Sequence, residues 1–206
     1  MRNVIIVEGK DDAAFIKTLA AGVETRTIEI KELGGAGKTN AVALTKALDA
    51  LKNDASLNPV SKIGIVLDLD PADFDPTTKL AFVNEALTSV FGVELTQVGV
   101  FEGITSIDAQ VVCYFINPNL DVLLRKIAAK PSPIANCLHA CIEKTAKPRE
   151  KDKAWPLYYI RWDICDAKER ENGGKHVNFT YANQKAAWKL DSSDLTDLKE
   201  FLSNFD

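Results

Sequence analysis

The fold is decided by the stretch Ile63-Gly64-Ile65-Val66-Leu67-Asp68-Leu69-Asp70. Its apolar and small residues run without interruption into Asp68 and Asp70, and Pro71 then marks a loop. A short unbroken apolar run predicts a strand that is buried on both faces, as in a parallel sheet. Because the two acids are two positions apart, their carboxylates point to the same side of the strand, about 6.6 Å apart.

Two carboxylates at the end of a buried strand need a physical reason, because buried charge without a partner is costly. In an open parallel sheet, ligands bind beyond the carboxyl ends of the strands. A divalent cation at this place would balance the charge of Asp68 and Asp70. The alternative is that both acids, together with Asp73, cap the following turn or helix.

The rest of the first half alternates strand-like and helix-like segments. The apolar run 3–7 ends at Glu8-Gly9, where glycine permits a tight turn into a helix that reaches about Ala21. The segments that follow are a strand at 25–33, a helix at 40–52, a helix at 79–91 and a strand at 97–101. This order predicts an α/β fold with a mostly parallel central sheet, flanking helices and right-handed crossovers.

After Gly103 the alternation becomes irregular. A strand is predicted at 109–116, and helices are predicted from Pro118, at 134–144 and in a final amphipathic segment capped by Ser192 or Ser193. We therefore predict two domains. Residues 1–103 hold the sheet, and residues 104–206 form a mixed, largely helical elaboration packed on it.

The composition is typical of a soluble globular protein. Of 206 residues, 46% are hydrophobic and 26% are charged, and the net charge of −4 argues against a generally basic nucleic-acid-binding surface. The apolar runs are too short for a membrane span or a signal peptide, so we expect no membrane contact. The four cysteines include no CxxC pair, which disfavours a zinc site and indicates a reduced, cytoplasmic protein.

Each of the two apolar runs is followed directly by an acid, Glu8 after the first and Asp68 after the second. If the strands at 3–7 and 63–67 are neighbours in the sheet, they lie about 4.8 Å apart. Glu8, Asp68 and Asp70 then converge at one edge of the sheet. Asp12, in the first turn of the following helix, leans over the same place. Hard oxygen ligands of this kind suit Mg²⁺ or Mn²⁺.

With these motifs the chain resembles the Toprim domain, which is shared by topoisomerases, bacterial primases, small recombination proteins and OLD-family nucleases. Val7-Glu8-Gly9 is similar to the glutamate-glycine motif after the first Toprim strand, and Leu67-Asp68-Leu69-Asp70 is similar to the Asp-x-Asp motif after the third. The form Glu8-Gly9-x-x-Asp12 is closest to the OLD-like branch and to small uncharacterised single-domain Toprim-related proteins. Many Toprim domains continue to a third alternating acid, whereas position 72 is Ala72.

The resemblance implies Mg²⁺-dependent phosphoryl transfer on nucleic acid, with phosphodiester cleavage as the leading reaction. In Toprim enzymes the Asp-x-Asp carboxylates coordinate the metal, and the glutamate is a ligand or a general acid/base. By position these residues are Asp68, Asp70 and Glu8, with Asp12 as a further candidate ligand and Lys10 as a candidate phosphate contact. The alternative is a non-catalytic Toprim scaffold that binds nucleic acid or a protein partner.

A glycine-rich loop supports a third hypothesis, a P-loop-like nucleotide hydrolase. Gly34-Gly35-Ala36-Gly37-Lys38-Thr39 supplies the end of a P-loop, but the first glycine should stand at position 32, which is Glu32. An acid has the wrong charge beside a triphosphate. The other interpretation is a turn in which Lys38 and the backbone N–H groups around Gly35 contact a phosphate.

A basic run follows in the second half. Residues 144–153 contain five basic and two acidic side chains, so they are either a nucleic-acid contact or a solvated loop. Trp155, Tyr158 and Trp162 come next, at a helical spacing that favours core packing over base stacking. The candidate nucleic-acid contacts are Lys147, Arg149, Lys151 and Lys153.

Overall fold

The computed structural model describes residues 1–22, 28–34, 41–69, 75–143, 145–171 and 178–205. The chain forms two compact units. The sheet unit comprises Met1–Ile116 and the C-terminal segment Asp197–Asp206, and the helical unit comprises Asn117–Thr196. The sheet unit is therefore larger than the predicted residues 1–103, because it includes the strands after Phe101 and the end of the chain.

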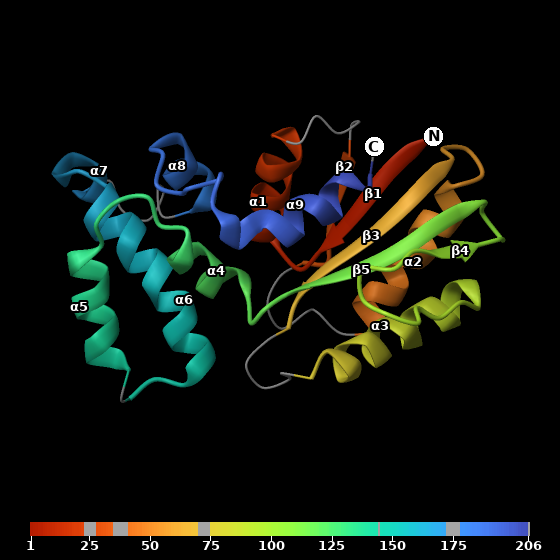
Figure 1. Ribbon diagram of the computed structural model, residues 1–206, viewed down its shortest axis with the longest axis horizontal. Coiled ribbons are helices and arrows are strands. Elements are labelled where there is room, and N and C mark those ends of the chain that lie inside the picture. The colour runs from red at the N-terminus through yellow and green to blue at the C-terminus, as the bar shows by residue number, and fades with distance from the viewer. Residues whose placement is uncertain (23–27, 35–40, 70–74, 144, 172–177, 206) are drawn as a thin grey trace. The chain divides into compact units, whose positions relative to one another are not determined.

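The sheet unit is built on one sheet with the strand order β2-β1-β3-β5-β4 (Figure 1). The first four strands in this order are parallel, and β4 pairs antiparallel to β5, which confirms the predicted α/β class and mostly parallel sheet. The strands are β1 (Arg2–Val7), β2 (Ile28–Glu32), β3 (Val60–Asp68), β4 (Glu102–Ile104) and β5 (Ala109–Ile116). The helices are α1 (Lys10–Ala21), α2 (Ala41–Asp54), α3 (Pro76–Phe91) and α9 (Thr196–Ser203).

The predicted strand at 97–101 is wrong. Gln97 is in a bend, Val98 and Gly99 are in a turn, and the short strand β4 begins only at Glu102. Gly99 has a positive φ of 80°, a conformation that glycine adopts without steric cost, and its N–H donates to the carbonyl of Cys113. The alternating apolar residues in this segment therefore belong to a turn against β5.

One face of the sheet packs against α2 and α3 (Figure 1). Alternate residues of the central strands point to this face, because successive side chains of a strand point to opposite sides. The cluster includes Val4 and Ile6 of β1, Ile63 and Ile65 of β3, Val111 and Cys113 of β5, Leu44 and Leu48 of α2, and Val83 and Leu87 of α3.

The opposite face is covered by α1 and by α9, which brings the end of the chain back to the sheet (Figure 1). Phe205, just after α9, is fully buried, and its ring lies over Gly64 of β3. A Cβ atom at Gly64 would lie 2.7 Å from Phe205 Cζ and 3.1 Å from Ile5 Cγ1. The side-chain amide of Asn3 donates a hydrogen bond to the carbonyl of Phe205. Position 64 therefore has room only for glycine.

The helical unit is held by an aromatic core. Trp155 and Tyr159 are stacked with ring centroids 5.0 Å apart, and Trp188 packs against Tyr159 at 5.3 Å. The hydroxyl of Tyr159 accepts a hydrogen bond from the N–H of Lys130 and donates one to the carbonyl of Ala187. Its elements are α4 (Leu120–Lys126), α5 (Pro133–Ile142), α6 (Pro148–Tyr158), the π-helix η1 (Tyr159–Ile164), α7 (Ala167–Glu171), α8 (Phe179–Gln184) and the 3-10 turn η3 (Ser193–Leu195).

The packing at Gly64 generates a prediction about stability. Gly64→Ala should lower the free energy of unfolding by about 1–3 kcal/mol, because overpacking a filled core forces neighbouring groups to move. Gly103→Ala is the matched control, since a Cβ there meets no atom within 4 Å. Urea unfolding followed by circular dichroism measures both, and equal stability of the two variants would contradict the proposed contact with Phe205.

Candidate functional site

The strand order places a ligand-binding position at the carboxyl ends of β1 and β3. From β1 the chain passes to β2 on one side, and it then returns to β3 on the other side. The crevice between two such strands, where the connections leave in opposite directions, is where open α/β sheets bind ligands. Glu8 follows β1 directly, and Asp68 is the last residue of β3. The register, with Val7 beside Val66, brings these strand ends level.

Glu8 links three elements at this edge although it is only 6% exposed. Its Oε1 accepts a hydrogen bond of 3.2 Å from the backbone N–H of Asp68. Lys79, from the first turns of α3, holds its Nζ 3.8 Å from the same oxygen, and its side chain is 11% exposed. The buried carboxylate therefore has both a hydrogen-bond donor and a positive charge beside it, as buried charge requires.

Asp12 approaches the same place from the first turn of α1. Its carboxylate accepts a 3.1 Å hydrogen bond from the N–H of Gly9, which closes the turn between β1 and α1. Burial, followed by the negative charge of Glu8, raises the pKa of Asp12 from 3.8 to about 7. This shift places Asp12 in the electrostatic field of Glu8. A nearby cation would favour the ionised form.

The structure thus places Glu8, Asp12 and Asp68 at the carboxyl edge of the sheet unit. Asp70 lies outside the described residues, as do Gly35 and Lys38. In the described ranges, no three histidine, cysteine, aspartate or glutamate side chains form a group that could hold a metal ion. The predicted ligand set for Mg²⁺ or Mn²⁺, in which Asp70 is a member, stays a prediction.

The predicted basic contacts belong to the helical unit. The solvated-loop interpretation is wrong for residues 148–153, because they begin α6 (Pro148–Tyr158), with Lys147 at the N-cap position. The backbone N–H of Lys147 donates to Glu150, which closes the first turn of the helix. Lys147 and Lys153 are exposed and Lys151 is half-buried, whereas the side chain of Arg149 is outside the described part. In the sheet unit, Lys10 is exposed at the first position of α1.

Sequence reasoning missed Lys79. The predicted helix at 79–91 begins at this residue, and neither its type nor its neighbours mark it as part of the acidic edge. The signal that could have found it is its position in the helix that follows the Asp-x-Asp strand, since the first turn of such a helix lies near the strand end. Its ammonium also lies 5.7 Å from the ring centroid of Phe82, so an aromatic face supports the buried charge.

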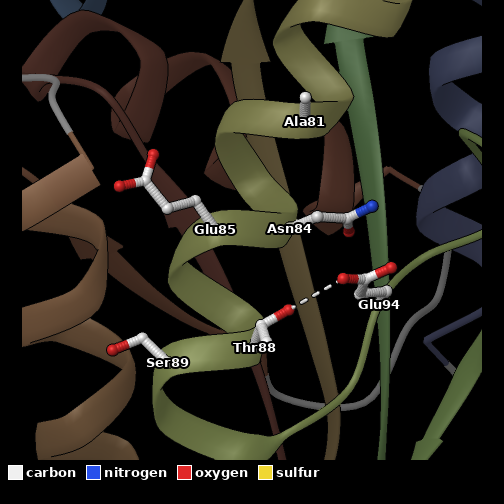
Figure 2. A pocket seen from close by; sticks show the side chains of 6 residues that line it. All are labelled: Ala81, Asn84, Glu85, Thr88, Ser89 and Glu94. Atoms are coloured by element: carbon white, nitrogen blue, oxygen red, sulfur yellow. Dashed lines mark hydrogen bonds between the residues drawn. The ribbon is translucent and has the colours of Figure 1, made fainter.

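A shallow hollow on α3 is distinct from this acidic edge (Figure 2). It has a volume of about 570 Å³ and is widely open to solvent. Asn84 uses its amide twice, donating to the carbonyl of Leu95 and accepting from the N–H of Leu95. Thr88 donates to Glu94 at 3.4 Å. The polar groups in this hollow therefore anchor the segment after α3. The residues that line it are Ala81, Asn84, Glu85, Thr88, Ser89 and Glu94.

Comparison with known proteins gives one match. The family described as "Protein of unknown function (DUF3226)" matches residues 2–205. The chain belongs to the DUF3226 family. No curated protein and no solved structure matches it. The DUF3226 match spans both units, so the acidic edge and the helical unit are parts of one family pattern. Over the part of the chain that the structure describes, no helix has the length and apolar character needed to cross a membrane.

The raised pKa of Asp12 predicts how stability depends on pH. Between pH values near 3.8 and about 7 the folded protein binds more protons at Asp12 than the unfolded chain does. The stabilisation from this group is complete below the unfolded pKa and is lost as the pH rises through the folded pKa. In the presence of EDTA, Asp12→Asn should therefore flatten the decrease in stability between pH 5 and pH 8, roughly the range in which this group titrates.

Urea unfolding midpoints across this pH range provide the measurement. Asp49→Asn, at an exposed acid of α2, is the control, and its profile should follow that of the wild type. An Asp12→Asn profile that keeps the full wild-type slope would show that Asp12 is not the titrating group.

Proposed function

We propose that this DUF3226 chain is a Toprim-like, Mg²⁺-dependent phosphoryl-transfer protein that acts on nucleic acid, with phosphodiester cleavage as its reaction. The observation that carries the proposal is the contact between the buried Glu8 carboxylate and the end of β3. This contact joins the two motif positions at the switch point of the sheet, where a ligand is expected.

The donor chemistry of this edge fits a hard divalent cation. Glu8, Asp12 and Asp68 offer carboxylate oxygens, the ligands that Mg²⁺ and Mn²⁺ prefer. The pKa of Asp12 is raised by burial and by Glu8, so the edge carries crowded negative charge that Lys79 only partly balances. We assign Asp68 and, by the resemblance, Asp70 as ligands. Glu8 is a further ligand or the general acid/base, and Asp12 completes the set.

A bound Mg²⁺ or Mn²⁺ ion would neutralise charge on the transferring phosphate and orient the attacking oxygen. The protein groups have separate tasks. Glu8 is held by the N–H of Asp68, so its carboxylate has a fixed direction from which to accept a proton. Lys79 lies close enough to the same carboxylate to bring positive charge to a phosphate bound there. The buried position of Glu8 keeps water from screening these charges.

Metal binding is the first test of this proposal. Asp68→Asn should weaken Mn²⁺ binding at least about tenfold, the lower end of the loss caused by removing a partner that supports a metal site. The hydrogen bond to Glu8 comes from the backbone of residue 68, so the substitution leaves it in place. Titration calorimetry measures the affinity. Asp49→Asn, an exposed carboxylate on α2, is the control that should bind Mn²⁺ like the wild type.

Catalysis is the second test. Glu8→Gln should reduce Mn²⁺-supported cleavage of plasmid DNA and of single-stranded RNA by about 100-fold or more, the typical contribution of a general acid or base. Gln keeps an oxygen that can accept the N–H of Asp68, so the strand ends should stay joined. Gel assays with the Asp49→Asn control measure cleavage. Wild-type protein that binds nucleic acid and metal but cuts neither substrate would support the non-catalytic scaffold instead.

A further inference from the structure

The end of α6 changes from an α-helix to the π-helix η1, and this change moves one tryptophan out of the core. Trp155 and Tyr159 are buried and stacked at 5.0 Å. Trp162 stands seven residues after Trp155 and would share its face in a regular α-helix. It is instead 39% exposed, because the wider turn of η1 places it elsewhere. Such π segments occur frequently at functional sites.

Two guanidinium groups lie against the exposed ring. Arg161 Cζ is 5.7 Å from the ring centroid of Trp162, and Arg170 Cζ, from α7, is 5.8 Å from it. Arg170 also donates to the carbonyl of Cys165 at 2.6 Å, which fixes its position. We call Arg161, Trp162 and Arg170 the tryptophan–arginine cluster.

Two nearby acids, Asp163 and Glu169, have other partners. Asp163 accepts hydrogen bonds from the N–H groups of Ile134 and Ala135 and so caps α5. Glu169 forms an ion pair with Lys185 at 2.7 Å. Within the described ranges, neither Arg161 nor Arg170 forms an ion pair with a carboxylate. The cluster therefore keeps positive charge beside an exposed aromatic ring.

We propose that the tryptophan–arginine cluster binds single-stranded nucleic acid. A base stacks on the surface formed by the indole and the guanidinium planes, and the neighbouring phosphates accept hydrogen bonds from the guanidinium groups. Single strands are favoured over duplexes because the bases of a duplex are already stacked on one another and offer no free face. The proposal deepens the function proposed above by naming its substrate class, but its test does not depend on the metal site.

The test measures binding of the full chain to a short fluorescein-labelled oligothymidylate by fluorescence anisotropy, in EDTA and at low salt. Trp162→Ala should weaken binding about tenfold, in the range found for loss of one stacked base, whereas Trp162→Phe should retain most of the affinity. The double variant Arg161→Gln/Arg170→Gln should weaken binding and reduce the slope of log affinity against log salt by roughly one. Circular dichroism and urea unfolding verify that each variant is folded.

Arg125→Gln is the matched control. Arg125 lies 5.7 Å from the ring centroid of Trp155, the same kind of contact, but Trp155 is only 2% exposed and cannot stack on a base. This variant removes one positive charge from the same unit, where the double variant removes two, and it should bind almost like the wild type. Loss of affinity in Arg125→Gln equal to that in the double variant would overturn the proposal in favour of general charge attraction.

Competition distinguishes the class of ligand. Unlabelled oligothymidylate should displace the probe well, and duplex DNA and heparin should displace it poorly at equal phosphate or sulfate concentration. Equal displacement by heparin, or unchanged binding by Trp162→Ala, would overturn base stacking. The probe is bound in EDTA, without a divalent cation, so that a failed metal site and a failed cluster give different results.

Discussion

The architecture of the sheet unit depends on one buried carboxylate. Glu8 stands where β1 ends, and its oxygen accepts the N–H of Asp68 across the gap to β3. An apolar residue at position 8 would leave this N–H and the ammonium of Lys79 without an acceptor at a buried edge, which is costly. A charged residue in the same place needs those two groups to compensate its burial. The end of β1, the adjacent strand β3 and the start of α3 are thus held together by the need to compensate one buried charge.

The same requirement explains why the acidic edge is concentrated rather than spread along the sheet. From Val4 to Val7 and from Ile63 to Leu67, β1 and β3 contribute only apolar and small side chains to both faces of the sheet. The acids follow directly at the carboxyl edge, where the backbone N–H groups of the next turn and the first turn of α1 are available to them. A rigid apolar sheet holds a small polar site at its boundary, and the chemistry of the site is set by which acids the turns present.

Much of the sheet could be predicted because its central strands are encoded locally. The unbroken apolar runs before Glu8 and Asp68 define β1 and β3, and the helical spacing in α2 and α3 is regular. The placement of Glu8 and Asp68 at one edge followed from strand adjacency, and that of Asp12 followed from its position in the first turn of the next helix. The contact of Lys79 with Glu8 and the exposure of Trp162 were not predicted. The first depends on how far a long side chain reaches from the start of α3, and the second depends on a local change of helix type that carries no compositional signal. The prediction of a strand at 97–101 failed because a turn packed against β5 can alternate apolar residues as a strand does.

The position of Phe205 has a consequence for how the chain is made. Gly64 and Phe205 are in contact, and Asn3 bonds to the carbonyl of Phe205 across a sequence separation of 202 residues. The whole helical unit is inserted between β5 and α9, so the segment that covers this face of the sheet is synthesised after the helical unit. Until then Ile5 and the bare backbone at Gly64 lack their cover. The sheet unit therefore completes its core only once the helical unit and Phe205 have been synthesised, and the nascent sheet carries an open apolar face until that point.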